Sequence, residues 1–242
     1  AVLQPIKYLM KNEKIISHFV DTDKNGNIDY QHLSSLLSKF ESNTLVSLMH
    51  ANNEIGIIND IKKIGEICKK NNAFFHSDAV QTVCHYEIDL SEIYINSITA
   101  SAHKFHGPKG TGLLYVKKGV PMSPIIVGGG QERQRRSGTE NVPGIVGLAK
   151  ALEFADSSMH FFNEHCNELN KHFREKLSQL KYDHLIVTPK TNTLPNILNI
   201  CFDNFEGEPI LIGLDMAGIC ASSGSACSSA SLEPSHVLIA QG

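Results

Sequence analysis

The sequence lacks the features of a membrane protein, a nucleic-acid-binding protein or a metalloprotein. Its formal net charge is −3, so no excess of basic residues offers a surface for nucleic acid. No apolar run approaches the roughly 20 residues that a membrane-spanning helix needs. The six cysteines are scattered, and no two have Cys-x-x-Cys spacing. We therefore expect no nucleic acid, no membrane and no metal ion among the partners of this chain.

The sequence also has little of what a secreted protein needs. Residues 1–5 lack both a methionine and the basic-then-apolar pattern of a signal peptide. The scattered cysteines do not resemble the disulfide framework of small secreted domains. We therefore expect reduced thiols and a cytoplasmic location.

What the sequence does contain is enough apolar residues for a sizeable core. Hydrophobic residues make up 41% of the 242 positions, which suits one large or two modest domains. Apolar runs at residues 44–49, 73–75, 98–100 and 111–116 predict strands, and the isoleucine spacing over residues 58–68 predicts a helix. Two strand–helix–strand passages in a row predict a mostly parallel α/β sheet flanked by helices.

The N-terminal 40 residues contain a motif that resembles a calcium site. Residues 21–29 read DTDKNGNID, as in the opening of an EF-hand loop, but the twelfth position is His32 instead of glutamate. The alternative is a turn at Asn25 and Gly26 between two short extended segments, and we adopt that interpretation. Around it we expect helices at residues 7–11 and 30–40 and a strand at residues 15–20.

The second part of the chain predicts a smaller α/β domain. Apolar residues recur at three- and four-residue steps over residues 141–154 and 163–180, which predicts two helices. A strand at residues 197–202 and a helix at residues 209–216 are expected to follow. We expect the large domain to cover residues 1–155 and the small domain residues 156–242.

Three polar residues, Asn53, Asp78 and Lys104, follow predicted buried strands, so we expect them at one edge of the sheet. A lysine in a crowded, partly dry site can form a Schiff base, and an aspartate can keep a heteroaromatic ring nitrogen protonated. This pairing is typical of pyridoxal 5′-phosphate enzymes. The alternatives are a solvated loop lysine and an aspartate that caps a helix. His76 and His103 are either reacting groups or hydrogen-bonding histidines of the core.

Two further segments have both a functional and an ordinary interpretation. Residues 128–141 combine three glycines in a row with three arginines, which suits either an anion site or a solvated basic turn. Residues 221–231 are rich in serine, alanine and glycine around Cys227, which suits either a flexible linker or a loop that carries a reactive thiolate. The other five cysteines lack such surroundings, and we interpret them as structural thiols.

Four motifs together resemble the cysteine desulfurases of the NifS/IscS type, in the class V, fold-type I aminotransferase superfamily. They are HANNEIG at residues 50–56, HSDAVQ at 76–81, SAHK at 101–104 and SGSACSSA at 223–230. The motifs occur in the family's order and span almost the whole chain. The resemblance implies a PLP-transferase fold of type I, with a mostly parallel sheet and part of a smaller C-terminal α/β domain.

The resemblance also implies a role for each matching residue in a site for pyridoxal 5′-phosphate. Lys104 would hold the cofactor as a Schiff base and move protons, and His103 would lie over the ring as an acid/base group. Asp78 would pair with the ring nitrogen, and Cys227 would be the nucleophile that receives sulfur. The remaining cofactor contacts implied by the family are Gln81 and Asn53 near the ring's phenolic oxygen, Ser101 at the phosphate, and Thr139 at the phosphate of the neighbouring subunit.

The implied reaction converts L-cysteine to L-alanine and leaves a persulfide on Cys227, for delivery to a sulfur acceptor such as an iron–sulfur scaffold protein. A homodimer is implied because the family's Ser-Gly-Thr element, here residues 137–139, reaches into the neighbouring subunit. Two alternatives remain. One is a selenocysteine lyase or other class V enzyme, and the other is a catalytically incomplete fragment that acts as a binding or assembly module.

The chain departs from the family at both ends. The family's upstream phosphate loop and ring-stacking histidine, and its downstream substrate-clamping arginine, have no counterpart in these 242 residues. We therefore expect the chain to be the middle part of the enzyme, truncated at both ends. We also expect it alone to bind the cofactor weakly and turn over slowly.

Overall fold

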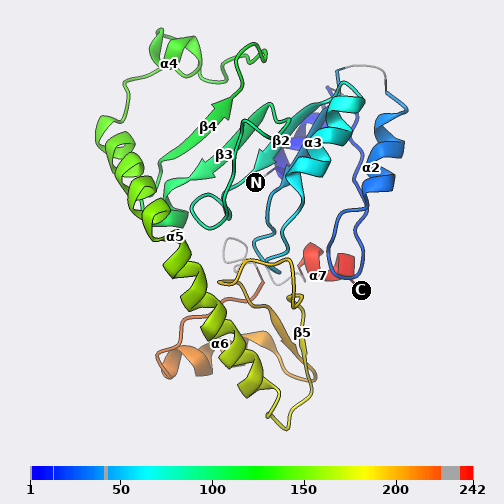
Figure 1. Ribbon diagram of the computed structural model, residues 1–242, viewed down its shortest axis with the longest axis vertical. Coiled ribbons are helices and arrows are strands. Elements are labelled where there is room, and N and C mark those ends of the chain that lie inside the picture. Colours follow the sequence, from blue (N-terminus) through cyan, green and yellow to red (C-terminus); the bar gives the residue numbers. More distant parts are fainter. Residues whose placement is uncertain (1, 13, 41–42, 225–234, 242) are drawn as a thin grey trace. The chain divides into compact units, whose positions relative to one another are not determined.

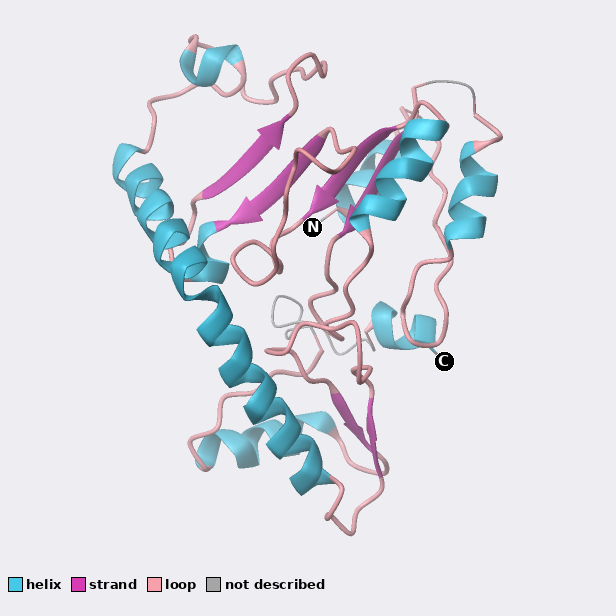
Figure 2. Cartoon of the chain, in the orientation of Figure 1, coloured by secondary structure: helices cyan, strands magenta, loops and turns pink. Residues whose placement is uncertain are grey.

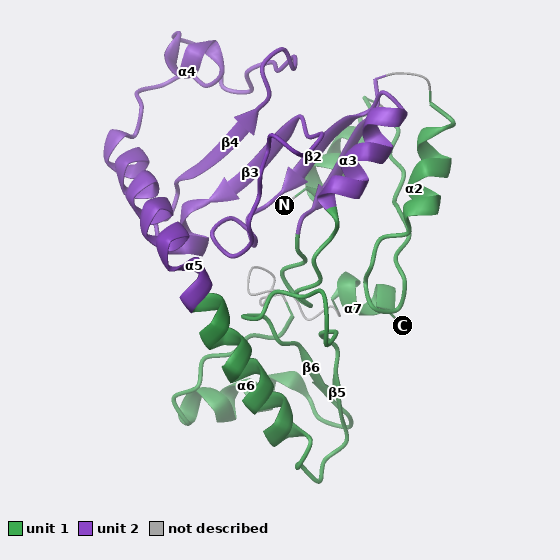
Figure 3. Ribbon diagram, viewed as in Figure 1, with its two compact units in different colours: residues 1–41, 51–60, 162–242 green, residues 42–50, 61–161 purple. Residues whose placement is uncertain are grey.

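The computed structural model describes residues 2–12, 14–40, 43–224 and 235–241 (Figure 1). The chain forms two compact units (Figure 3). Unit 1 comprises Ala1–Glu41, Ala51–Asp60 and Phe162–Gly242, and unit 2 comprises Ser42–His50 and Ile61–Phe161. The chain therefore passes from one unit to the other after residues 41, 50, 60 and 161.

Unit 2 contains a four-stranded sheet in the order β1-β2-β3-β4 (Figure 2). Its first three strands are parallel and the fourth is antiparallel, which confirms the prediction of a mostly parallel sheet. Met49, Asp78 and Thr99 are register partners across the three parallel strands. The strands are β1 (Leu45–Met49), β2 (Phe74–Asp78), β3 (Ser97–Ser101) and β4 (Gly112–Val116).

The two faces of this sheet differ in chemistry because side chains alternate along each strand. Phe75 and Ile98 point to one face and are buried, and so is Ser77, whose hydroxyl has no hydrogen-bond partner among the described residues. His76 and Thr99 belong to the opposite face and are half-buried. The candidate site lies where the parallel strands end, beyond Asp78 and Ser101.

Helix α3 (Ile61–Lys70) connects β1 to β2 and packs along β2. It begins three residues later than predicted, because the N–H and C=O of Ile58 bond instead to the carbonyl and carboxamide of Asn192. A β-carbon on Gly65 would collide with the backbone carbonyl of Tyr94, so no side chain larger than that of glycine fits here between α3 and Tyr94. The order β1–α3–β2 confirms the second of the two predicted strand–helix–strand passages, and the connection between β2 and β3 contains turns and no helix.

Helix α5 (Val142–Leu177) is one helix of 36 residues, where the sequence predicts two. Residues 155–162 contain no glycine or proline, so nothing interrupts the backbone hydrogen bonds there. Asn141 caps the helix, since its carboxamide oxygen accepts the N–H of Gly144 at 3.1 Å. Leu148 and Leu152 of α5 pack against a buried cluster around Phe105, which anchors the first part of α5 within unit 2.

Unit 1 contains short elements drawn from both ends of the chain. The predicted strand at residues 15–20 is wrong, because this segment pairs with no strand in the described part of the chain and Ile16 is 83% exposed. The predicted strand at residues 197–202 shortens to three residues. The elements are α1 (Leu3–Lys11), α2 (Tyr30–Leu37), an antiparallel pair of β5 (His184–Ile186) and β6 (Ile200–Phe202), α6 (Gly207–Met216) and α7 (His236–Gln241).

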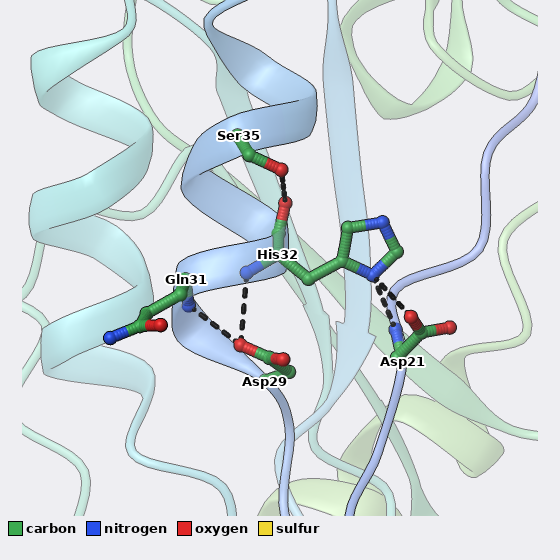
Figure 4. Close-up of polar contacts among 5 residues, drawn as sticks. All are labelled: Asp21, Asp29, Gln31, His32 and Ser35. Atoms are coloured by element: carbon green, nitrogen blue, oxygen red, sulfur yellow. Dashed lines mark hydrogen bonds and ion pairs between the residues drawn. The ribbon is translucent and has the colours of Figure 1, made fainter.

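The segment that resembles a calcium loop is a turn followed by a helix cap. Asp23 accepts the backbone N–H groups of Asn25 and Asn27, and Gly26 has a φ of 82°. Asp29 caps α2 by accepting two backbone N–H groups, and His32 Nδ1 lies 2.9 Å from the carboxylate of Asp21 (Figure 4). Since these carboxylates are used locally, the structure confirms the turn interpretation.

Neither a metal cluster nor a membrane-spanning helix is found in the described part of the chain. There, no three residues of the types His, Cys, Asp and Glu are grouped in a way that could hold an ion. Across the same residues, each helix is too short or too polar to cross a membrane.

Candidate active site

The candidate site lies at the carboxyl edge of the parallel strands in unit 2. Asp78 ends β2 and Ser101 ends the neighbouring strand β3. A short 3₁₀ helix, η1 (Ala102–Phe105), follows β3 directly and carries His103 and Lys104. The structure therefore brings these four predicted residues to one edge of the sheet, as expected for a ligand site in this kind of sheet.

Asp78 is fixed in place by its backbone and by one carboxylate oxygen. Its carbonyl accepts the N–H of His50 at 2.9 Å, and Oδ1 accepts the N–H of Val80 at 3.0 Å. No helix follows Asp78, so the helix-cap alternative is wrong and the carboxylate closes a turn instead. Oδ2 has no partner among the described residues, which leaves it able to accept a proton donor from a ligand.

His76 links the three parallel strands two residues before Asp78. Its Nδ1 lies 2.8 Å from Ser47 Oγ on β1, and its Nε2 lies 3.4 Å from Thr99 Oγ1 on β3. Burial lowers the pKa of His76, against the opposing effect of the Asp78 charge, so the ring is neutral at pH 7. His76 is therefore a hydrogen-bonding histidine, one of the two roles that the sequence allows.

His103 is exposed and bonds to the residue that precedes η1. Its Nδ1 lies 2.8 Å from the hydroxyl oxygen of Ser101. This contact orients both side chains at the end of β3. Nε2 of His103 has no partner among the described residues, so it is available to a bound molecule.

Lys104 is partly buried, and its backbone has a partner that the sequence does not reveal. Nε2 of His85 lies 3.4 Å from the Lys104 carbonyl. Burial lowers the pKa of His85, and since a carbonyl accepts only, the neutral ring carries its proton on Nε2. His85 is 19 residues from Lys104 and belongs to none of the four motifs, so sequence reasoning had no signal for it.

The remaining described candidates lie in turns and loops. Gln81 is partly buried in the turn after β2, and Thr139 is exposed. Asn53 belongs to unit 1, where it lies within a turn closed by Asn52, whose Oδ1 accepts the N–H groups of the next residues, Glu54 and Ile55. Cys227 lies outside the described residues.

The segment at residues 128–141 is exposed except at Gln131 and Ser137. Ser137 is buried and donates its hydroxyl to the carbonyl of Gly129 at 2.8 Å. The short helix α4 (Gln131–Gln134) contains three consecutive residues in the left-handed region, with φ of 49°, 57° and 63° at residues 132–134. Each residue in this backbone conformation costs about 1–3 kcal/mol of folding free energy, and such strain is found mostly at functional sites.

Two of the five described cysteines, Cys68 and Cys84, fit a structural role. All five are free, and Cys68 and Cys84 are buried. Burial raises the pKa of Cys68 to about 12 and that of Cys84 to about 11, so neither is a thiolate at neutral pH. The pKa values of Cys166 and Cys201 are raised by burial as well.

The residues at this edge fit the chemistry of pyridoxal 5′-phosphate. The free Oδ2 of Asp78 suits a protonated ring nitrogen, and the partly buried amine of Lys104 suits an aldehyde. The hydroxyl of Ser101 and the ring of His103 supply polar contacts on the same side.

Comparison with known proteins places this geometry in a family context. The class-V aminotransferase family matches residues 1–241. The chain is 45% identical over 240 residues to cysteine desulfurase IscS of Dictyoglomus turgidum, covering 99% of this chain and 60% of that protein. It is 46% identical over 224 residues to cysteine desulfurase IscS of Methanosarcina thermophila, covering 93% of this chain and 55% of that protein.

Solved structures show the same fold. A NifS-like protein superposes with a TM-score of 0.89 at 38% identity, covering 99% of this chain and 62% of that chain. SspA in complex with cysteine superposes with a TM-score of 0.79 at 31% identity, covering 100% of this chain and 66% of that chain. The fold prediction is thus confirmed. The chain spans 55–60% of the length of these two curated relatives.

Proposed function

The chain belongs to the class-V aminotransferase family. We propose that it is a pyridoxal 5′-phosphate-dependent cysteine desulfurase, which converts L-cysteine to L-alanine. The observation that carries this proposal is the placement of Asp78, with one carboxylate oxygen free, at the end of β2 and of Lys104 in η1, directly after the adjacent parallel strand β3. The 45% identity to a relative named cysteine desulfurase supports the choice of reaction.

Residues at strand ends and residues in loops would together hold the cofactor. Asp78 Oδ2 would hold a proton on the ring nitrogen, Lys104 would bind the aldehyde carbon, and Ser101 would bind the phosphate. Gln81 and Asn53 would hydrogen-bond near the phenolic oxygen. When bound, pyridoxal 5′-phosphate supplies the electron sink that stabilises negative charge on the substrate's α-carbon.

Two side chains would move protons. The amine of Lys104 would take the proton from the α-carbon of the substrate and return one later. The contact between Ser101 and Nδ1 of His103 leaves Nε2 of His103 as the atom that exchanges a proton with the substrate. His85 holds the carbonyl of Lys104 and keeps η1 in place beneath these groups.

We propose that Cys227 accepts the sulfur. Its thiolate would attack the sulfur of bound L-cysteine, and the carbon–sulfur bond would break with its electron pair kept on the carbon. That carbon takes up a proton and becomes the methyl group of alanine. One thiol and one L-cysteine thus give one persulfide and one L-alanine, with no external oxidant.

We further propose a homodimer in which Thr139 reaches the cofactor phosphate of the neighbouring subunit, and an acceptor such as an iron–sulfur scaffold protein that takes the sulfur. The free thiols of the described residues support a reducing, cytoplasmic compartment. We also keep the division into a cofactor-binding domain at residues 1–155 and a smaller domain at residues 156–242 as a proposal.

An absorption spectrum with added pyridoxal 5′-phosphate tests the cofactor site. We expect a visible band that disappears on borohydride reduction and that is absent from Lys104→Ala. Lys109→Ala is the matched control, since Lys109 is an exposed lysine of the following loop. A band of equal intensity in Lys104→Ala would refute the assignment of the lysine.

Mass spectrometry after addition of L-cysteine tests the reaction. We expect alanine release and a mass increase of one sulfur on Cys227, both lost in Cys227→Ser. Cys220→Ser, at an exposed cysteine nearby in the sequence, should behave as the unsubstituted protein. A visible band without alanine release would leave a cofactor-binding module and would reject the desulfurase.

A further inference from the structure

The chain after β2 folds into a series of turns that ends at Cys84, His85 and Tyr86. The N–H groups of His85 and Tyr86 both donate to the carbonyl of Thr82, at 2.9 and 2.8 Å. Thr82 is fully buried, and its own N–H donates to the carbonyl of Ala79 at 3.0 Å. These hydrogen bonds fix the backbone of residues 84–86 to the end of β2.

Cys84 anchors this segment in the core of unit 2. Its side chain belongs to the buried cluster around Phe105, and its Sγ lies 3.8 Å from the carbonyl oxygen of Leu152 on α5. Cys84 also has a φ of 65°, a left-handed conformation that is unfavourable for a residue with a β-carbon. Such a conformation persists only where the surrounding structure enforces it, so the packing of Cys84 sets the path of the next two residues.

His85 contacts the element that carries the candidate lysine. Its Nε2 lies 3.4 Å from the carbonyl oxygen of Lys104 in η1. Other hydrogen bonds fix η1 near its ends, since the N–H of Ala102 donates to the carbonyl of Thr111 at 3.0 Å and the N–H of Gly107 to the carbonyl of Ala102 at 2.8 Å. His85 therefore adds a contact at the backbone of the lysine itself.

Tyr86 contacts the residue that fixes the candidate aspartate. Its ring meets the ring of His50 edge to face, with 5.2 Å between the ring centroids and 83° between the ring planes. His50 is 1% exposed, and its N–H donates to the carbonyl of Asp78 at 2.9 Å. Because an edge-to-face ring pair is favourable beyond the area it buries, Tyr86 stabilises His50 and, through it, the carbonyl of Asp78. All of these residues belong to unit 2.

We infer that residues 84–86, which we name the 84–86 turn, are a positioning element that sets where Lys104 lies relative to Asp78. His85 and Tyr86 are neighbours in the chain, with Cα atoms about 3.8 Å apart, so neither can shift far without the other. Asp78 and Lys104 would hold different parts of one rigid ring, so their separation has to match that ring before it binds. This inference rests on the proposed function, and it links two residues that the mechanism itself leaves separate.

Hydrogen exchange in the cofactor-free protein tests the contact of His85 without catalysis. In His85→Ala the amides of Ala102 and Gly107, at the start of η1 and just beyond its end, should exchange about tenfold faster. The amide of Asn96, which donates to a carbonyl of β2, should keep its rate, whereas a general loosening of unit 2 would speed all three. His85→Gln keeps an N–H near the place of Nε2 and should restore the original rates.

The same measurement tests the contact of Tyr86. In Tyr86→Ala the amide of His50 should exchange about tenfold faster, while the amides of η1 keep their rates. Tyr86→Phe keeps the ring contact and should behave as the unsubstituted protein. The control is His172→Ala, at an exposed histidine of α5, which should change none of these amides. Unchanged exchange at η1 in His85→Ala, or at His50 in Tyr86→Ala, would overturn the inference.

Titration with pyridoxal 5′-phosphate, followed by the visible band, tests whether the two contacts act together. We expect the dissociation constant to rise about fivefold in His85→Ala and in Tyr86→Ala, because either loss leaves the separation of Lys104 and Asp78 unset. The double variant should bind at most about tenfold more weakly than the unsubstituted protein, instead of the roughly 25-fold that independent contacts would give. His85→Gln and Tyr86→Phe should stay within about twofold of the unsubstituted protein.

The outcomes separate this inference from the proposed function. If the unsubstituted protein binds the cofactor and the two alanine variants bind it equally well, the positioning role is overturned and the desulfurase proposal stands. If the two losses multiply in the double variant, His85 and Tyr86 act independently and the inference is overturned. If the unsubstituted protein shows no visible band, the cofactor site is rejected and the positioning role with it.

Discussion

Nδ1 of His76 lies 2.8 Å from the hydroxyl of Ser47, its register partner on the neighbouring parallel strand. The bond is formed by a histidine that burial keeps neutral, two residues before the carboxylate that we assign to the cofactor. Protonation of His76 would place a second donor on the ring and disturb the edge at which Asp78 lies. The site thus depends on an uncharged imidazole in the sheet.

This dependence predicts a loss of stability in mild acid. Because burial lowers the pKa of His76 in the folded state below the usual value of about 6.5, the unfolded chain binds more protons than the folded one as the pH falls below about 6.5. The contribution of the neutral His76 ring to the free energy of unfolding is fully present above that pH. It is lost as the pH falls through the folded-state pKa of His76. Thermal unfolding of His76→Gln should therefore depend less on pH between 7 and 5 than that of the unsubstituted protein. Equal pH dependence in the two proteins would contradict this account.

Gly65→Ala should destabilise unit 2 although alanine favours helices. The new β-carbon would meet the backbone carbonyl of Tyr94, which cannot rotate away, so we expect a loss of about 1–3 kcal/mol in the free energy of unfolding. Gly213→Ala is the matched control, since Gly213 also lies within a helix but has no atom within 4 Å of the added carbon. Urea unfolding should show that Gly213→Ala raises the free energy of unfolding by about 0.5–1 kcal/mol. A higher free energy of unfolding in both variants would show that α3 can move away from Tyr94.

Ser77→Ala should leave the protein equally stable or stabilise it by about 1 kcal/mol, because the buried hydroxyl has no partner among the described residues. Thr188→Val provides the contrast. Thr188 is equally buried, but its hydroxyl oxygen accepts the N–H of Asn199 at 2.7 Å, so its loss should cost about 1–2 kcal/mol. Chemical denaturation measures both. A substantial loss in Ser77→Ala would mean that this hydroxyl has a partner.

Alkylation by iodoacetamide should distinguish the described cysteines. Cys220 is exposed and should react within minutes, whereas Cys68 is buried with a pKa raised to about 12 and should react only after unfolding. Mass spectrometry with and without denaturant measures each site. Rapid alkylation of Cys68 in the folded protein would show that the packing of α3 opens readily.

Asp29→Ala should cost about 1 kcal/mol, because it removes the oxygen that accepts the N–H groups of Gln31 and His32 at the start of α2. Asp29→Asn keeps an acceptor there and should lose much less. Adding calcium should leave the unfolding temperature of all three proteins unchanged, since the loop carboxylates are occupied by local hydrogen bonds. A rise on adding calcium would revive the EF-hand alternative.

The strands and the residues at their ends could be predicted because they depend on local pattern. The apolar runs before Asp78 and Lys104 each produce a strand, and the parallel pairing then places both residues at one edge. The turn at Asn25 and Gly26 was equally predictable, since Gly26 adopts the positive φ that such a turn needs.

Some of the errors came from contacts between residues distant in sequence. The start of α3 depends on a bond from Ile58 to Asn192, which is 134 residues away. Residues 15–20 have the composition of a strand but find no partner, and the predicted break in α5 ignored the absence of any helix-breaking residue. The role of His85 depends on a contact with Lys104 that no periodicity encodes.

The alternation of the chain between its two units sets an order of events during synthesis. The residues of this chain that form unit 2 have all been synthesised once residue 161 has been added, whereas unit 1 also includes residues 162–242, which follow. At a rate of roughly 5–20 residues per second, those 81 residues take about 4–16 s. During that time the turn at Asn52 lacks its contacts with Asn199 and Ser235, whereas the sheet that leads to Asp78 and Lys104 already has all four of its strands.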